Sequence, residues 1–362
     1  MDFFTKIDIP AADWQIGYNS RLAFFGSCFA DNISAQFKAR KFNVLANPFG
    51  TVYNPLSTAM QIKAIANGKV FGDSDVFQDM RLGVSENSNE TRGPWHCWNA
   101  HGSLSAATRE ECIAKLNNAA KETREFLQKA NVVFITLGTS FVYFLKESGI
   151  AVSNCHRQNP SMFIRKMISV DHAAEALKSI VRDLQKIKQE SLDPLRDAPM
   201  TADSEQGKNR ELHIVFTVSP LRHMSDGAHE NTLSKATLQL AIEKVIREIG
   251  TVVATTVSYF PSYEITMDEL RDYRFYDDDM IHLSKTAEGY IFERMAETYC
   301  NEKTHEDIRK VEKFMKSANH RIVDSQASAS RDFAQKVIVQ AEALEKEIAG
   351  LNLEEEKRKF KK

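Results

Sequence analysis

The sequence lacks any run of apolar residues long enough to cross a membrane, and its start shows no basic segment followed by an apolar one. It also lacks a charge bias, because 47 basic residues are balanced by 49 acidic residues and the formal net charge is −2. Such a balance gives no general attraction to nucleic acid or to an anionic membrane. We therefore expect a cytoplasmic protein that binds neither of them.

Cysteine is scarce as well, with five scattered thiols at Cys28, Cys97, Cys112, Cys155 and Cys300. An odd number of dispersed cysteines is typical of free thiols in a reducing compartment rather than of a disulfide framework. Two histidine-containing stretches, residues 95–101 and 155–156, carry metal-ligand side chains, but their spacings match no structural zinc pattern. We interpret them as packing or as pocket lining, with a metal site as the alternative, and we expect no cofactor.

What the chain does contain is an alternation of short apolar strands and longer amphipathic helices. The strands are predicted at residues 22–25, 42–45, 131–138, 213–219 and 251–257. The helices between them are predicted at residues 29–41, 56–66, 105–130, 170–189 and 229–249. This alternation is typical of a three-layer α/β/α fold, in which helices cover both faces of a parallel sheet. Ligands bind such sheets at the carboxyl ends of the strands, where the polar clusters of this sequence fall.

Three stretches depart from this alternation. Residues 70–105 carry turn signals and aromatic residues without helical spacing, which predicts a partly β insertion, and residues 191–210 predict a polar insertion. A short hairpin is expected at 141–152. We assign residues 1–300 to one α/β domain and residues 301–362 to a charged helical extension. The extension is expected to be solvated, and self-association through its helices is the alternative.

The stretch from Leu22 to Ile33 joins the first strand to the first helix through a turn at Gly26-Ser27. A serine in such a turn lies beside the unpaired N–H groups that begin the helix, and these favour a developing negative charge. Ser27 is therefore a candidate nucleophile, although a serine that only caps the helix would give the same local sequence. Cys28 is the competing nucleophile, since a cysteine at the start of a helix has a lowered pKa.

A nucleophilic serine needs a base, and the base needs a group that orients it. Asp279 and His282 offer both at a spacing of i and i+3. They lie at the start of a helix that we expect from about residue 277 to Cys300. The alternative is that the acidic run 277–279 caps this helix and that the histidine is incidental.

The residues Gly26–Ala30, which read Gly-Ser-Cys-Phe-Ala, resemble the signature of the GSCFA-domain family, which is similar to the SGNH (GDSL-type) hydrolases. The block from Asp279 to His282 resembles the Asp-x-x-His block of SGNH hydrolases. The resemblance covers residues 20–300 and implies a flavodoxin-like α/β fold. It also implies a site in which Ser27 is the nucleophile, His282 is the general base and Asp279 orients the base.

The SGNH resemblance further implies an oxyanion hole. Its donors would be the N–H groups of Ser27 and Gly50, together with a side chain after the third strand, where Ser140 replaces the asparagine of SGNH hydrolases. The alternative donors, which are also candidate substrate-binding residues, are Asn47, Thr139 and Asn154.

Two more candidates follow the fourth strand. The run Ser219–His223 resembles a block of GSCFA proteins, and this places Arg222 and His223 at the rim of the same site. An arginine there suits a carboxylate or a phosphate on the substrate, unless it pairs with a structural carboxylate such as Glu264.

These residues predict a serine ester hydrolase, in which Ser27 attacks an ester carbonyl and water releases the acyl group from the acyl-enzyme. Trp95, Trp98 and Arg222 suggest a small-molecule or carbohydrate ester as the substrate. Two alternatives stay open. An O-acyltransferase would use a hydroxyl group in place of water, and an inactive ligand-binding module would explain the missing asparagine.

Overall fold

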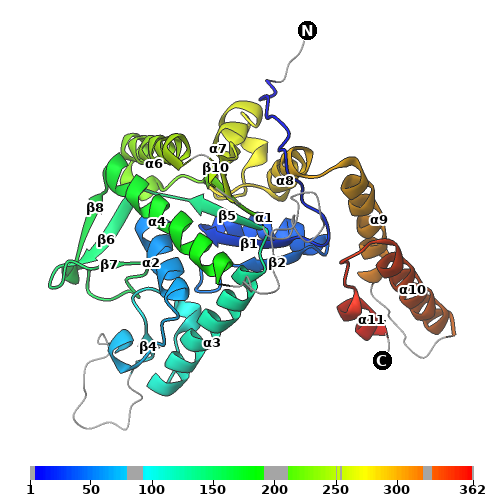
Figure 1. The fold of residues 1–362 in the computed structure, drawn as a ribbon, viewed down its shortest axis with the longest axis horizontal. Coiled ribbons are helices and arrows are strands. Elements are labelled where there is room, and N and C mark those ends of the chain that lie inside the picture. Colours follow the sequence, from blue (N-terminus) through cyan, green and yellow to red (C-terminus); the bar gives the residue numbers. More distant parts are fainter. Residues whose placement is uncertain are drawn as a thin grey trace.

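The computed structural model describes residues 5–79, 93–190, 211–249, 251–252, 255–320 and 328–360. Its centre is a six-stranded sheet in the order β10-β11-β9-β5-β1-β2 (Figure 1). Five strands run parallel: β1 (Arg21–Gly26), β2 (Asn43–Ala46), β5 (Val132–Leu137), β9 (Leu212–Val218) and β11 (Thr255–Tyr259). The sixth, β10 (Thr251–Val252), pairs antiparallel with β11. The five predicted strands are thus confirmed, and the last of them is divided between β10 and β11.

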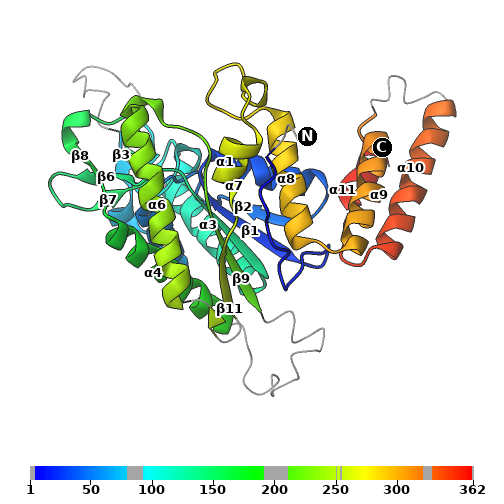
Figure 2. The same cartoon turned by 90° about the horizontal axis from the view of Figure 1, so that it is seen from above.

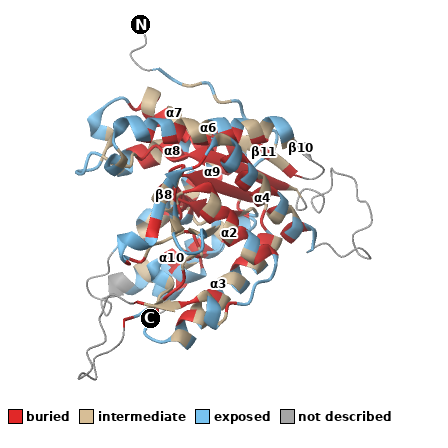
Figure 3. Cartoon of the chain, turned by 90° about the vertical axis from the view of Figure 1, so that its left-hand side faces the viewer, coloured by how far each residue is buried: buried red, intermediate tan, exposed pale blue. Residues whose placement is uncertain are grey.

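Helices flank both faces of this sheet (Figure 2). Because side chains alternate along a strand, Ala23 and Phe25 of β1 pack in one core cluster and Leu22 and Phe24 in the other. The first cluster is covered by α2 (Pro55–Ala66), α3 (Arg109–Gln128), α4 (Val170–Gln189) and α6 (Ala228–Ile249). The second is covered by α1 (Cys28–Ala39) and α8 (Lys285–Tyr299). Figure 3 shows the buried residues gathered in the strands and the inner sides of the helices, so the predicted α/β fold is confirmed.

Two small antiparallel sheets lie outside the main sheet. In the predicted insertion, β3 (Phe77–Gln78) pairs with β4 (Trp95–His96), and residues 80–92 lie outside the described residues. The predicted hairpin consists of β6 (Phe141–Leu145) and β7 (Ala151–Val152). A third strand that we did not predict, β8 (Phe163–Met167), pairs with β6. The second predicted insertion, residues 191–210, lies outside the described residues.

The helix expected from about residue 277 begins later than predicted. It is α8, which starts at Lys285 behind the capping hydroxyl of Ser284. The segment before it forms a closed loop, because the Asp277 N–H donates to the His282 carbonyl over 2.8 Å. Met280, with a φ of +58°, reverses the chain inside this loop. The acidic run 277–279 therefore belongs to a loop in which its side chains are exposed, and it does not cap the helix.

The C-terminal extension is helical, as predicted, with α9 (Glu302–Ala318), α10 (Ser328–Glu347) and α11 (Glu354–Phe360) at one side of the α/β body (Figure 1). Its apolar side chains are partly buried, because Val311 and Phe314 of α9 and Ala341 of α10 belong to the same core cluster as α1 and α8. Among the described helices, none is both long enough and apolar enough to span a bilayer.

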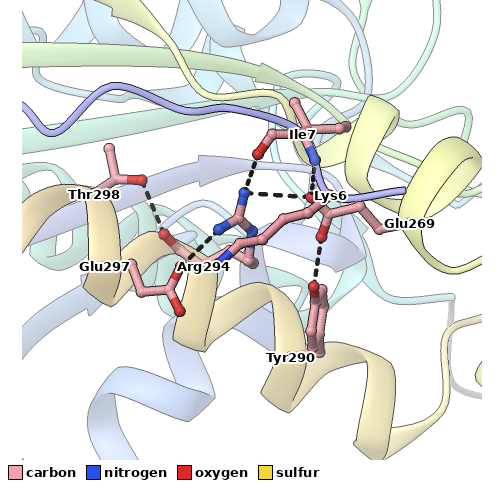
Figure 4. Close-up of polar contacts among 7 residues, drawn as sticks. All are labelled: Lys6, Ile7, Glu269, Tyr290, Arg294, Glu297 and Thr298. Carbon is pink, nitrogen blue, oxygen red and sulfur yellow. Dashed lines mark hydrogen bonds and ion pairs between the residues drawn. The ribbon is translucent and has the colours of Figure 1, made fainter. Parts of the chain in front are cut away.

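A buried ion pair ties the N-terminal segment to α8 (Figure 4). Arg294 of α8 lies 3.3 Å from the carboxylate of Glu269, and both side chains are buried. The Ile7 N–H donates to this carboxylate over 2.7 Å, and the Ile7 carbonyl accepts from Arg294 over 2.5 Å. Glu269 ends a π-helical turn that continues the short helix α7 (Ser262–Glu264). These bonds anchor the chain just before the loop that carries Asp279 and His282.

Candidate active site

The turn between β1 and α1 is held tightly against β5. Gly26 has a φ of +132°, and a Cβ at this position would lie 2.0 Å from the Thr136 carbonyl oxygen. The Ser27 N–H donates to the same oxygen over 3.2 Å. Only glycine fits this close approach. The turn is therefore a fixed feature, and it sets the direction of the two side chains that follow it.

Those two side chains point to different surroundings. The Ser27 side chain is buried, with 1 % of its residue surface exposed, and its hydroxyl has no hydrogen-bond partner among the described residues. It caps α1 by backbone position only, since the hydroxyl makes no capping bond. Cys28 is the first residue of α1 and is half-buried. Of the two candidate nucleophiles, Cys28 is the more accessible.

Cys28, His282 and Asp279 form a line of polar contacts. The Cys28 Sγ lies 3.9 Å from His282 Nε2, and His282 Nδ1 lies 2.5 Å from Asp279 Oδ2. The second carboxylate oxygen of Asp279 accepts the backbone N–H groups of Ile281 and His282 over 2.9 and 2.8 Å. One imidazole nitrogen is thus held by a carboxylate while the other faces a thiol. This is the arrangement that a nucleophile, a general base and an orienting acid require.

The carboxylate of Asp279 stays ionised down to low pH. The hydrogen bond from the His282 side chain, followed by those from two backbone N–H groups, lowers the pKa of Asp279 to about 2. A carboxylate at this position favours the imidazole tautomer that carries its proton on Nδ1. His282 Nε2 is then left with its lone pair toward the thiol.

Two opposing effects act on the Cys28 thiol. Burial raises its pKa and is the largest effect, whereas the N–H groups of Phe29 and of Cys28 itself lower it. The net result is a raised pKa, so the proton must be removed as the sulfur attacks. The Cys28 N–H lies in the first turn of α1, where N–H groups have no acceptor inside the helix. It is the natural donor to an oxyanion formed on a carbonyl bound to Cys28.

The predicted oxyanion donors are already engaged, which differs from our expectation. The Ser27 N–H donates to the Thr136 carbonyl, and the Gly50 N–H donates to the Asn47 carbonyl over 2.7 Å in a tight turn. The Ser140 hydroxyl is buried and donates to Ser234 over 3.1 Å. None of these three groups is left for an oxyanion in this geometry.

The alternative donors have structural partners too. Asn47 accepts from the Gly26 N–H over 2.8 Å and donates to Asp31 over 2.8 Å. Thr139 accepts from the Phe141 N–H, and its hydroxyl lies 3.0 Å from that of Ser234. Asn154 accepts from the His156 N–H over 2.7 Å. Asn47 and Thr139 fix loops at the ends of strands of the main sheet, and Asn154 fixes the loop after β7.

Arg222 and His223 follow β9, so they lie at the same edge of the sheet as Cys28, where the parallel strands have their carboxyl ends. The His223 ring makes an edge-to-face contact with Tyr53 at 5.6 Å, and burial lowers its pKa. Arg222 contacts the sulfur of Met267 at 4.0 Å, and no carboxylate pairs with it among the described residues. Glu264, its expected alternative partner, instead accepts from the hydroxyl of Tyr259. Arg222 therefore keeps a positive charge that no described carboxylate neutralises.

Tyr53 is a site residue that the sequence analysis missed. Its carbonyl accepts the N–H groups of Gly138 and Thr139 over 2.8 and 2.9 Å, and its phenol interacts electrostatically with Cys28. The signal was present, because Tyr53 follows the second strand in a loop of turn residues. Loops of this kind at the carboxyl end of a parallel sheet carry ligand-binding side chains.

His96 of the insertion and His156 of the loop after β7 belong to one packed cluster. His96 stacks on His156 with ring centroids 4.4 Å apart, and Trp98 stacks on Phe77 at 3.6 Å. His156 Nε2 lies 2.8 Å from the Cys97 carbonyl, and His96 Nδ1 lies 2.6 Å from the Ser105 hydroxyl. In the part of the chain that the structure describes, no three metal-ligand side chains converge. The contacts favour packing over a metal site.

Comparison with known proteins gives one match. A family model described as the GSCFA family matches residues 21–193 and 195–295. These ranges include the β1–α1 turn, the loops after β2, β5 and β9, and the loop that carries Asp279 and His282. No curated protein and no solved structure matches the chain.

Proposed function

Because the chain belongs to the GSCFA family, we propose that it is a hydrolase of ester or thioester bonds with Cys28 as its nucleophile. One observation carries this proposal: His282 Nε2 faces the Cys28 sulfur at 3.9 Å while Asp279 holds His282 Nδ1 at 2.5 Å. His282 is then the general base and Asp279 the group that orients it. The competing nucleophile, Ser27, has a buried hydroxyl without a described partner.

The reaction follows from these positions. His282 Nε2 takes the thiol proton as the Cys28 sulfur attacks the acyl carbon, and a tetrahedral oxyanion forms beside the Cys28 N–H. The intermediate collapses with loss of the alcohol or thiol, which receives the proton from His282. Water, deprotonated by His282, then attacks the acyl-thioester and releases the acid and the free thiol. Each half-reaction moves one proton through the same imidazole.

The order of the strands supports the same proposal. By chain position, the parallel strands lie in the order 2-1-3-4-5, which is that of flavodoxin-like folds and of the type that the SGNH resemblance implies. Cys28 follows the first strand, at the edge where such folds bind ligands. Arg222 is half-buried and pairs with no carboxylate among the described residues, which supports a small ester that carries a carboxylate or a phosphate, such as an acylated sugar derivative. If a sugar hydroxyl replaces water, the same steps give an O-acyltransferase.

A second candidate, a ligand-binding module without turnover, has its own supporting observation. The N–H of Gly50 and the hydroxyl of Ser140 are both engaged within the protein. Loss of one oxyanion donor costs about a hundred- to a thousandfold in rate. An oxyanion hole that is reduced to the Cys28 N–H would leave binding intact and catalysis weak.

Hydrolysis of short-chain p-nitrophenyl esters and thioesters by purified variants tests the proposal. We expect turnover to disappear in Cys28→Ala and in His282→Ala, and to persist in Ser27→Ala, which is the matched neighbour. Loss of turnover in Ser27→Ala alone would return the nucleophile to the serine. If no variant and no wild-type sample turns over ester or thioester, and Cys28 gives no acyl-enzyme by intact mass, the binding module is the better account.

A further inference from the structure

Asp31 lies one helical turn after Cys28 on α1. Side chains three residues apart lie on the same side of a helix, with their Cβ atoms about 5–6 Å apart. Asp31 is also half-buried, as Cys28 is. An acidic residue in the first turn complements the helix dipole, but that role needs no burial. The carboxylate of Asp31 is therefore a neighbour of the sulfur within the site.

The Asp31 carboxylate is held in one orientation by Asn47. Asn47 Nδ2 donates to Asp31 Oδ1 over 2.8 Å, while the side-chain oxygen of Asn47 accepts from the Gly26 N–H over 2.8 Å. The second bond fixes which end of the amide faces Asp31. Among the described residues, no donor bonds to Asp31 Oδ2. One oxygen of a preorganised carboxylate is thus available to a ligand.

In the described part of the chain, no cation neutralises this carboxylate. Lys38 and His101 act on Asp31 electrostatically, yet neither forms an ion pair with it. Burial, the largest effect, raises the pKa of Asp31, and the hydrogen bond from Asn47 counteracts the shift. Because the usual value is about 3.9, the group is still a carboxylate near neutral pH.

This charge works against the proposed nucleophile. Burial raises the pKa of the Cys28 thiol most, and the negative charge of Asp31 raises it further. A cation bound to Asp31 would cancel the second effect, because an opposite charge close to a carboxylate offsets its field. The position of Asp31 is therefore unfavourable in the free protein and becomes favourable when a positively charged ligand is bound.

Asp31 and Arg222 lie on opposite sides of Cys28 in the order of the strands. Asn47, which holds Asp31, follows β2 at one edge of the sheet, whereas Arg222 follows β9, on the other side of β1. The nucleophile thus lies between a carboxylate without a cation and a guanidinium without a carboxylate among the described residues.

We propose that Asp31 binds an ammonium group of the substrate, and that the substrate is a small ester or thioester with an amino group next to its reacting carbonyl, such as an α-aminoacyl ester. The inference rests on the proposed function in that Cys28 is the nucleophile. The i, i+3 separation suits an acyl carbon bound to the Cys28 sulfur and an amino group on the following carbon. Asp31 is then a specificity-determining residue, and His282 removes the thiol proton more readily once the ammonium is in place.

The first test measures how fast Cys28 reacts with two thiosulfonates that differ in charge. 2-Aminoethyl methanethiosulfonate carries an ammonium group, and methyl methanethiosulfonate is neutral. Each forms a disulfide with the Cys28 thiolate and releases methanesulfinate, and mass spectrometry of the unreduced Cys28 peptide follows the rate. The ratio of the two rate constants cancels the thiolate fraction. We expect this cationic-to-neutral ratio to fall about tenfold at low salt in Asp31→Asn, which keeps an oxygen for the Asn47 amide.

Asp278→Asn is the matched control, since it removes an exposed carboxylate from the loop that carries His282. Its ratio should stay near that of the wild type. An unchanged ratio in Asp31→Asn overturns the proposal, as does an equal fall in Asp278→Asn, which would mean that only the general field of the site acts on the reagent. Asp31→Ser is the second neutral variant. If neither Asp31 variant folds by circular dichroism, Asp31 is a structural residue and the proposal is overturned as well.

The second test uses the ethyl esters of alanine, lactic acid and isobutyric acid, which carry an ammonium, a hydroxyl and a methyl group at the same carbon. In Asp31→Asn, we expect the kcat/KM preference for alanine over isobutyrate to fall about tenfold, and the preference for lactate over isobutyrate to stay unchanged. An equal fall in both preferences would indicate a site for any hydrogen-bond donor and would overturn the ammonium assignment.

The two tests separate this inference from the proposed function, because the thiosulfonate reaction requires no turnover. A lowered cationic-to-neutral ratio in Asp31→Asn without hydrolysis of any ester supports the ammonium site and counts against the hydrolase. Ester hydrolysis by the wild type with an unchanged ratio in Asp31→Asn overturns the ammonium site alone.

Discussion

The Gly26 N–H donates to the side-chain oxygen of Asn47 over 2.8 Å, and this bond fastens the turn before Cys28 to the loop that follows β2. Asn47 in turn donates to Asp31 of α1. Asn47 therefore connects the end of β1, the loop after β2 and the first turn of α1. We expect these hydrogen bonds to fix the direction of the Cys28 side chain.

Gly26→Ala is the first prediction. A Cβ here would lie 2.0 Å from a backbone oxygen at a φ of +132°, so the turn must move. We expect a loss of more than about 3 kcal/mol in the free energy of unfolding by urea. Gly289→Ala is the control, since a Cβ on this α8 residue meets no atom within 4 Å. It should stabilise the helix by about 0.5–1 kcal/mol. Equal effects of the two substitutions would contradict the close approach of Gly26 to Thr136.

Asp279→Asn is the second prediction. The amide cannot hold His282 in the tautomer that leaves Nε2 free, so kcat should fall by about a hundredfold or more. Because hydrogen bonds lower the pKa of Asp279 to about 2, its carboxylate is ionised at every pH above that value. Any loss of activity between pH 6 and 4 must then come from another group, and the acid limb of the wild-type profile should not follow Asp279. Asp278→Asn, a change at the exposed neighbour, should leave kcat unaltered.

Arg222→Gln is the third prediction. Among the described residues, no carboxylate pairs with the Arg222 guanidinium. If this group receives a negative group of the substrate, KM for an ester that carries a carboxylate should rise by about tenfold while that for a neutral ester stays the same. Initial rates with a matched pair of p-nitrophenyl esters, a hemisuccinate and a butyrate, measure this difference. The control is Arg274→Gln, because Arg274 is exposed and already pairs with Asp272. Identical changes for both esters would mean that Arg222 does not recognise charge.

The fourth prediction concerns stability in acid. Burial, the largest effect, lowers the pKa of His156 to about 4, against a usual value of about 6.5. Between these values the unfolded chain binds more protons than the folded one, so stability falls as the pH drops through this window. The contribution is on the order of 1–3 kcal/mol. Urea unfolding at pH 7 and pH 4.5 should show a smaller loss in His156→Phe than in the wild type, and an unchanged loss in His172→Phe, whose side chain is exposed.

The sheet could be predicted from the sequence because its strands are nearly pure apolar runs. β5 and β9 are buried along their whole length, and such runs between amphipathic helices leave few other folds open. β8 was missed for the opposite reason. Phe163 is its single buried residue, so the strand shows neither an apolar run nor a clear alternation.

The choice between Ser27 and Cys28 could not be made locally. Adjacent residues at a strand–helix junction point in different directions, and which one faces the histidine depends on the φ of Gly26 and on bonds to Thr136 and Asn47. These partners lie far away in the sequence. The contact between Asp279 and His282 was easier to predict, since the two residues meet within one loop.

In the loop before α8, the expected contact between Asp279 and His282 is present although the predicted helix is not. An acidic run followed by an apolar pattern is typical of a helix start, and we predicted one. In the structure, a backbone bond from Asp277 to His282 and a positive φ at Met280 close a loop there instead.

The apolar cluster behind α1 and α8 does not end where the family match ends. The match stops at residue 295, inside α8, whereas the cluster continues into Val311 and Phe314 of α9 and Ala341 of α10. A fragment cut at that boundary would remove Tyr299, Val311 and Phe314 from this cluster. The cooperative folding unit of this chain is therefore longer than the segment by which its family is recognised, and α9 and α10 should melt together with the sheet rather than ahead of it.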